Sequence, residues 1–174
     1  MNMLASELTS LQIFRGLDEQ AATAICQSLK RIGYDANENI LSEGVGVQAL
    51  WIILSGECIV SRNCGEAEDR TLAVLRAGDV FGEMSFVRSA PHSASIKSVT
   101  PVSVCCFHRE DFLQLAKDHP SAAYQISLNI AAVLSERLRR MDAWVCDMVE
   151  SPNGHDYRDE WQSFRSAVYT NWAF

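Results

Sequence analysis

The glycine-punctuated middle of the chain constrains the fold most strongly. Six of the nine glycines fall between positions 44 and 82, among short runs rich in β-branched and aromatic residues. These runs are ALWIILSG, ECIVSR, TLAVLRAG, ASIKSV and PVSVCCF. Runs of this length, separated by glycine, asparagine and proline, are typical of short strands joined by tight turns. The region from Tyr34 to Phe107 is therefore predicted to form an all-β sandwich or barrel.

Helical patterns flank this region on both sides. The segment LDEQAATAICQSLKRI is predicted to form a helix capped by Asp18, with four apolar residues on one face, namely Ala21, Ala22, Ile25 and Leu29. The helical period returns after HREDF, and a long helix is predicted from Ser121 to about Val149. We expect a domain over residues 1–149 and a short, helical tail over residues 150–174.

The long helix carries an apolar repeat with alternating spacings of three and four residues. The repeat consists of Ala131, Leu134, Leu138, Met141, Val145 and Met148. This is the spacing of a coiled-coil seam, so the helix is predicted to join two copies of the chain as a homodimer. A helix that lies along its own β domain would show nearly the same spacing, and this alternative stays open.

The charge balance and hydropathy argue against two classes of partner. A formal net charge of −7 disfavours broad attraction to nucleic acid or to anionic lipid. No apolar run approaches the roughly 20 residues that a membrane helix needs. We expect a cytoplasmic protein without direct contact to nucleic acid or to a membrane.

Cysteine and histidine positions give no metal or redox pattern. The six cysteines include no C-x-x-C pair, and the four histidines are scattered. Cys105 and Cys106 are adjacent on a predicted strand, so their side chains should point to opposite faces. A metal-dependent jelly-roll enzyme of the cupin type would need clustered inward ligands, which this pattern does not provide. No catalytic residue, metal ligand or cofactor is predicted.

Residues 81 to 95, FGEMSFVRSAPHSAS, hold the candidate chemistry. A short helix that starts after the Gly82 turn would present unpaired amide hydrogens to a phosphate. Glu83 would instead accept hydrogen bonds from neighbouring sugar hydroxyls. A cationic side chain at position 92, after the turn at Pro91, would close over the phosphate.

Four pieces of the chain together resemble the cyclic nucleotide-binding domain of catabolite-activator-type regulators, protein kinase A regulatory subunits and cyclic-nucleotide-gated channels. The pieces are IFRGL, ALWIILSGECIVSR, LRAGDVFGE and GEMSFVRSAPHSA, within about residues 11 to 148. The resemblance implies a mainly β domain: an eight-stranded antiparallel jelly-roll barrel with N-terminal helices. It also implies a long C-terminal helix that covers the ligand, which would be cyclic AMP or cyclic GMP.

The resemblance also implies a set of ligand-binding residues. These are Phe81, Gly82, Glu83, Met84, Ser85, Pro91, His92, Ser93 and Ala94, with Arg137 and Arg140 as neighbours on the covering helix. His92 stands where the family has an arginine, and an imidazole with a reference pKa of about 6.5 is mostly neutral at pH 7. Losing a charge-assisted hydrogen bond weakens binding roughly 10- to 150-fold. The amides of residues 82–85, the hydroxyls of Ser93 and Ser95, or an inward Arg88 would compensate in part.

Two functions follow, and His92 separates them. In the first, the chain is a cyclic nucleotide sensor that regulates an unknown partner chain through movement of the long helix. In the second, it is a degenerate relative that no longer binds nucleotide and serves as a dimeric interaction module. In the second case, Glu83 is only a first-turn carboxylate favoured by the helix dipole. The segment after Met148 is short and acidic, so no helix-turn-helix domain is expected.

Overall fold

The structure is a computed structural model that describes residues 3–63 and 70–150 of the chain. The predicted tail helix after Glu150 lies outside the described residues. Within them, none of the helices combines the length and the hydropathy needed to cross a lipid bilayer.

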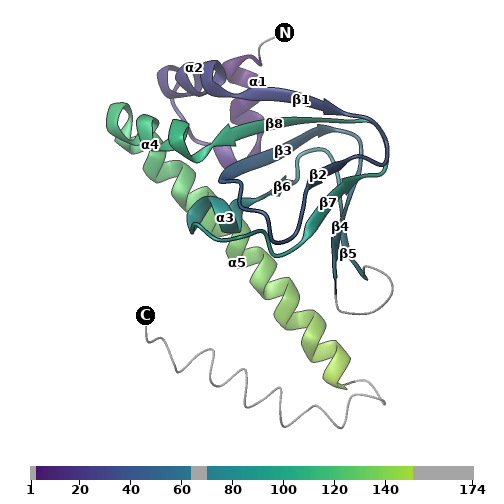
Figure 1. The fold of residues 1–174 in the computed structure, drawn as a ribbon. Helices are drawn as coiled ribbons and strands as arrows, with labels where there is room; N and C mark the ends of the chain where they lie inside the picture. The colour runs from purple at the N-terminus through teal and green to yellow at the C-terminus, as the bar shows by residue number, and fades with distance from the viewer. Residues whose placement is uncertain (1–2, 64–69, 151–174) are drawn as a thin grey trace. The chain divides into compact units, whose positions relative to one another are not determined.

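Eight strands in the described residues form two four-stranded antiparallel sheets (Figure 1). The strands are β1 (Lys30–Tyr34), β2 (Asn39–Leu41), β3 (Ala49–Ser55), β4 (Cys58–Arg62), β5 (Arg70–Leu75), β6 (Val80–Phe81), β7 (Ser95–Ser98) and β8 (Val102–His108). One sheet has the order β1-β8-β3-β6 and the other β2-β7-β4-β5. The predicted eight-stranded antiparallel fold is therefore confirmed.

The core lies between the two sheets and includes alternate residues of β3 and β8. In β3, Ala49, Trp51 and Ile53 belong to a buried cluster that draws on strands of both sheets. The intervening Leu50 and Ile52 are also buried. Because successive side chains of a strand point to opposite faces, β3 is covered on both faces. Full burial explains why ALWIILSG is a continuous apolar run.

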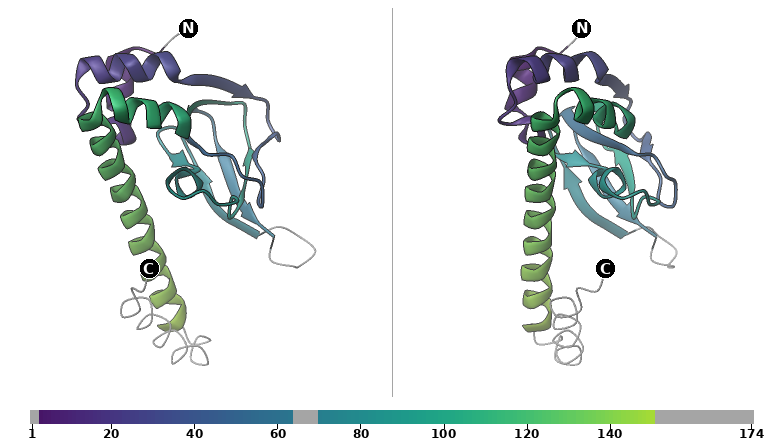
Figure 2. Two further views of the ribbon diagram at one scale, coloured as in Figure 1. Left: turned by 60° about the vertical axis from the view of Figure 1, so that its left-hand side comes forward. Right: turned by 90° about the vertical axis from the view of Figure 1, so that its left-hand side faces the viewer.

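The helices before and between the strands are short. They are α1 (Ala5–Ser10), the 3₁₀ helix η1 (Gln12–Phe14), α2 (Glu19–Ser28), α3 (Glu83–Val87) and α4 (Arg109–Asp118). Figure 2 shows α1, α2 and α4 grouped together beside the start of β1. The Asp18 carboxylate accepts a hydrogen bond from the Ala21 amide at 2.8 Å, as the predicted cap requires.

One boundary of the sequence analysis is wrong. The helical pattern was expected to continue to Ile32, but α2 ends at Ser28 and β1 starts at Lys30. The reason is long-range pairing, since β1 is antiparallel to β8 from Lys30 opposite Cys106 to Tyr34 opposite Val102. The backbone bonds of this pairing override the local helical pattern of LKRI.

Aromatic contacts fix α3 against the rest of the fold. Phe86 of α3 packs against Phe107 of β8 with ring centroids 6.3 Å apart, and against Phe112 of α4 at 5.4 Å. Phe107 also meets Phe14 of η1 edge-on at 5.9 Å. These contacts place α3 at a defined position beside the sheet that contains β3 and β6.

The predicted long helix is present as α5 (Pro120–Glu150). The chain divides into two compact units between Ile130 and Ala131. In the first unit, Ile126 and Ile130 of α5 are buried. The Asn129 side-chain amide donates hydrogen bonds to the carbonyls of Ile13 and Arg15 at 2.8 and 2.9 Å. The start of α5 is thus bonded to the N-terminal segment.

Candidate functional site

The site begins at the turn between β6 and α3. Gly82 is the N-cap of α3 and has a φ of 78°, in the left-handed region. A Cβ at this position would lie 2.6 Å from the Ala49 carbonyl oxygen and 2.9 Å from Cδ1 of Trp51. Both backbone conformation and space therefore require glycine. The predicted glycine turn and short helix are confirmed.

Arg109 holds the other end of α3. Its guanidinium donates hydrogen bonds to the carbonyls of Phe86 and Val87, the latter at 3.1 Å. A cation at a helix C-terminus interacts favourably with the exposed carbonyls there. The sequence analysis missed this residue, because Arg109 is far from α3 in sequence and nothing in HREDF indicates the contact.

Glu83 is buried in the first turn of α3, with an exposed fraction of 3%. A carboxylate that served only to complement the helix dipole would remain hydrated at the surface, because burial of a charge is unfavourable. Its burial beside the Gly82 turn is therefore the arrangement expected of a group with a specific polar partner.

His92 is also buried, with an exposed fraction of 7%. Its backbone is bonded on both sides: the His92 amide donates to the Val45 carbonyl at 3.0 Å, and the Gly44 amide donates to the His92 carbonyl at 2.9 Å. Burial lowers the pKa of the imidazole below its ordinary value of 6.5. The ring is therefore neutral at pH 7 in this structure.

Ser85 connects α3 to the imidazole. Ser85 Oγ lies 3.0 Å from Nδ1 of His92 and donates to the Gly82 carbonyl at 3.0 Å. Which of the two groups donates in the Ser85–His92 contact depends on the tautomer of the imidazole. The other ring nitrogen, Nε2, is buried and has no hydrogen-bond partner among the described residues. The structure thus brings Gly82, Ser85 and His92 together.

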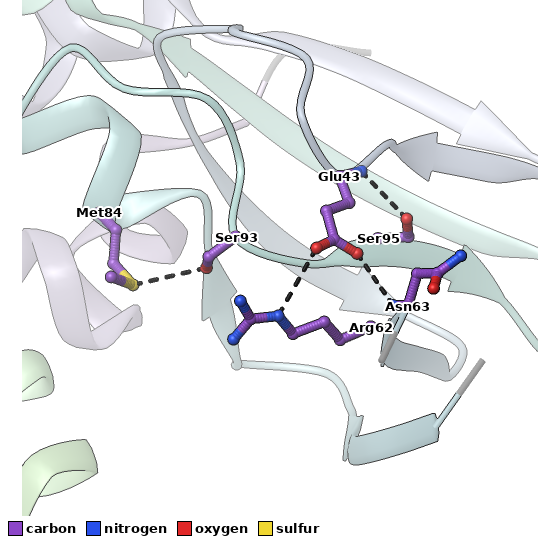
Figure 3. Close-up of polar contacts among 6 residues, drawn as sticks. All are labelled: Glu43, Arg62, Asn63, Met84, Ser93 and Ser95. Atoms are coloured by element: carbon purple, nitrogen blue, oxygen red, sulfur yellow. Dashed lines mark hydrogen bonds and ion pairs between the residues drawn. The ribbon is translucent and has the colours of Figure 1, made fainter. Parts of the chain in front are cut away.

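The remaining predicted site residues are at the margin of this cluster. Phe81 is buried, Ala94 is half-buried, and Met84, Pro91 and Ser93 are exposed. Ser93 Oγ donates to the Met84 sulfur at 3.9 Å (Figure 3). Arg88 is exposed, so it does not fold inward as a replacement cation.

Glu43 connects the neighbouring loops. Its amide donates to Ser95 Oγ at 3.0 Å, and its carboxylate accepts a hydrogen bond from the Asn63 amide at 3.0 Å (Figure 3). Arg62 Nε lies 3.5 Å from the same carboxylate. The Ser95 hydroxyl thus makes a structural contact with Glu43. Glu43 precedes Gly44 and Val45, the backbone partners of His92, and its carboxylate fixes this segment to the end of β4.

Trp51 is a second residue that the sequence analysis missed. Its side chain is buried with an exposed fraction of 6%, and its indole Nε1 has no hydrogen-bond partner among the described residues. The only signal in the sequence was a tryptophan within an otherwise aliphatic strand.

The residues predicted on α5 lie in the second unit. Arg140 Nε lies 3.0 Å from the Glu136 carboxylate, and Arg137 is half-buried. Along the predicted seam, Leu138 and Met141 are exposed at 51% and 52%, Ala131 is exposed, and Leu134 and Val145 are half-buried. The Met148 side chain lies outside the described residues.

Among the described residues, no group of three or more histidine, cysteine or acidic side chains could hold a metal ion. The described cysteines are free thiols. Burial raises the pKa values of Cys58 and Cys106 to about 11, which makes both thiols unreactive. Cys106 lies in the core, whereas Cys105 lines a separate cleft of about 510 Å³ with Cys26 and Arg31. The two neighbours therefore point to opposite faces, as predicted.

Comparison with known proteins gives a family match over the central part of the chain. Residues 31–119 match the family model described as cyclic nucleotide-binding domain. The cyclic AMP receptor protein of Thermus thermophilus is 33% identical over 130 residues, which cover 75% of this chain and 58% of the relative. The CRP-like cAMP-activated global transcriptional regulator of Mycobacterium tuberculosis is 26% identical over 137 residues, covering 79% and 59%.

A solved structure shows the same fold. The crystal structure of a cyclic nucleotide-binding domain from Methylobacillus flagellatus superposes with a TM-score of 0.76. The match covers 85% of this chain and 86% of that one, at 22% sequence identity. By contrast, this chain spans less than two thirds of the length of the two regulators named above.

Proposed function

The chain belongs to the cyclic nucleotide-binding domain family, and from this premise we propose that it is a cyclic nucleotide sensor without catalytic activity. Its ligand would be cyclic AMP or cyclic GMP, bound at the turn around Gly82. The bound ligand would alter α5 and thereby regulate a separate partner chain. The competing proposal is a degenerate domain that has lost the nucleotide and acts as an interaction module.

One observation supports the sensor: the buried Nε2 of His92, which no described protein atom engages. An unsatisfied buried polar group is unfavourable by about 1 to 3 kcal/mol, so folded proteins rarely retain one without a use. A degenerate site would have replaced this nitrogen by an apolar group or given it a protein partner. A phosphate oxygen of the ligand would satisfy it by accepting the Nε2 hydrogen of the protonated ring.

The proposed chemistry divides the ligand between two side chains. An ionised carboxylate has no hydrogen to donate, so Glu83 would accept hydrogen bonds from the ribose hydroxyls. The negative phosphate favours protonation of His92. The imidazolium then donates its Nδ1 hydrogen to Ser85 and its Nε2 hydrogen to a phosphate oxygen. The backbone amides of residues 82–85 would add further donors.

Thermal unfolding with and without ligand tests the proposal directly. A cyclic nucleotide at 100 times its dissociation constant should stabilise the fold by about 2.7 kcal/mol. Cyclic AMP and cyclic GMP should be compared with the linear 5′-monophosphates, which carry the same base and sugar. If neither cyclic nucleotide raises the unfolding temperature at millimolar concentration, the degenerate domain is the better description.

The affinity for cyclic nucleotide is expected to rise as pH falls from about 7.5 to 6. Burial keeps the His92 pKa below 6.5 in the free protein, whereas phosphate would raise it in the complex, so binding takes up a proton. Calorimetry across this pH range, in buffers of different ionisation enthalpy, measures both the affinity and the proton uptake. An affinity that does not change over this pH range would show that His92 does not bind the phosphate.

The ligand-free protein should respond to pH in the opposite direction. The folded state lowers the pKa of His92, so the unfolded chain binds the proton more readily once pH falls below about 6.5. The contribution of His92 to stability is thus complete above about pH 6.5 and declines as pH falls toward the lowered pKa. His92→Gln is the control, because it should reduce both pH dependences while the other histidines remain.

We also propose that α5 forms a homodimer through its exposed seam. Lysine at Leu138 and Met141 together should lower the oligomeric mass to that of a monomer, because charges at seam positions are poorly accommodated. Light scattering after size-exclusion chromatography measures the mass. Ala143→Lys, an exposed position on the same helix outside the seam, is the matched control. An unchanged mass in the double variant would refute the seam.

A further inference from the structure

Trp51 has a buried polar atom that no feature of the fold explains. The side chain lies in the cluster between the two sheets, and its indole Nε1 has no hydrogen-bond partner among the described residues. An indole nitrogen is a donor only, so its partner must be an acceptor. Phenylalanine would fill the same cluster without a buried donor. The buried indole N–H therefore indicates a role for Trp51 beyond packing.

The indole lies beside the candidate ligand site. Trp51 of β3 is directly opposite Phe81 of β6, the residue before Gly82. A Cβ at Gly82 would fall 2.9 Å from Cδ1 and 3.6 Å from Nε1 of the indole. The edge of the ring that carries the N–H thus borders the glycine turn. Gly82 is in turn bonded through its carbonyl to Ser85, the partner of His92.

Packing holds the indole in a fixed orientation. Its ring stacks on Phe81 with centroids 6.0 Å apart and an interplanar angle of 6°. Both side chains are buried, so neither can turn toward solvent without disrupting the core. A donor whose direction is set before the ligand arrives loses little conformational entropy on binding.

We propose that the indole N–H of Trp51 donates a hydrogen bond to an oxygen of the sugar–phosphate ring of the bound cyclic nucleotide. This inference rests on the proposed function and adds a second side-chain donor beside His92. Both nitrogens are buried, lack a hydrogen-bond partner in the described part of the chain, and belong to side chains that contact Gly82 or Ser85. A ligand oxygen at this turn would satisfy the indole donor, which no described protein atom does.

The two donors would differ in their response to pH. The imidazole changes its charge near neutrality, whereas the indole N–H does not titrate in this range. Trp51 would therefore supply a part of the affinity that persists at high pH, when His92 is neutral. A comparison of the loss at low and high pH therefore separates a direct contact of Trp51 from an effect that acts through His92, and an analogue that keeps the ring shape separates the N–H from packing.

Replacing the N–H without changing the shape tests the inference. Incorporation of benzothienylalanine at position 51 puts sulfur in place of the indole nitrogen and keeps the ring. It should weaken binding of cyclic AMP or cyclic GMP about tenfold, equivalent to about 1.4 kcal/mol, at both pH 6 and pH 8. Trp51→Phe should give a similar loss. Trp144→Phe, at an exposed tryptophan of α5, should give none.

Three outcomes can be distinguished by calorimetry on the full chain. An unchanged dissociation constant with the benzothiophene ring overturns the role of Trp51 and leaves the sensor intact. A loss that appears only at pH 6 also overturns it, because the effect would then act through His92. If the unmodified chain binds neither nucleotide, the proposed function fails and this inference fails with it. Should Trp51→Phe not fold, the shape-preserving analogue still decides.

Discussion

Arginine in place of His92 is expected to tighten cyclic nucleotide binding roughly 10- to 150-fold at pH 7.5. The guanidinium is always charged and can contact two phosphate oxygens at once, whereas the buried imidazole must first take up a proton. Calorimetry with cyclic AMP and cyclic GMP measures the gain, which should shrink as pH falls and the native histidine becomes charged.

The same substitution should destabilise the ligand-free protein. A buried position that holds a neutral ring bonded to Ser85 would then hold a charged group, and burial of a charge is unfavourable. His92→Lys, which supplies a single point charge, is expected to improve binding less than arginine does. If arginine brings no gain at any ligand concentration, the space beside the turn does not admit a phosphate, and the degenerate domain is favoured.

Glutamine in place of Glu83 should weaken cyclic nucleotide binding roughly 10- to 150-fold, because the amide replaces a charged acceptor of ribose hydroxyls. Inorganic phosphate, which has no sugar, serves as the second ligand and should lose little affinity. Competition titrations with both ligands measure the difference.

Glu19→Gln is the matched control for this prediction. Glu19 also occupies the first turn of a helix, but it is exposed on α2. Its replacement should leave both affinities unchanged. Equal losses for cyclic nucleotide and for phosphate in Glu83→Gln would show that the carboxylate shapes the turn and does not contact the sugar.

The parts of the site that depend on local geometry could be predicted from the sequence. Gly82 must be a glycine because the turn needs a positive φ, and the short helix follows directly from it. The antiparallel strands were recognisable from turn residues and apolar runs, and the cap at Asp18 from its position before an apolar face. Each of these signals lies within a few residues of the feature that it predicts.

Contacts between distant segments could not be predicted in this way. Arg109 reaches the carbonyls of α3 from another helix, and Trp51 meets Gly82 across a strand pair. The bond between Ser85 and His92 depends on where the loop after α3 returns. For the same reason, β1 begins earlier than the local pattern indicates, since its partner strand is about seventy residues away in sequence.

The reciprocal backbone bonds between the loop at Gly44–Val45 and His92 have a consequence for the native state's motions. The amide hydrogens of Gly44 and His92 cannot exchange with solvent unless the two segments separate. Both amides should therefore become exposed in a single opening event. A molecule that binds His92 would therefore also restrict the loop between β2 and β3. Slowed deuterium uptake at the Gly44 amide would then report binding at a position that the ligand need not contact.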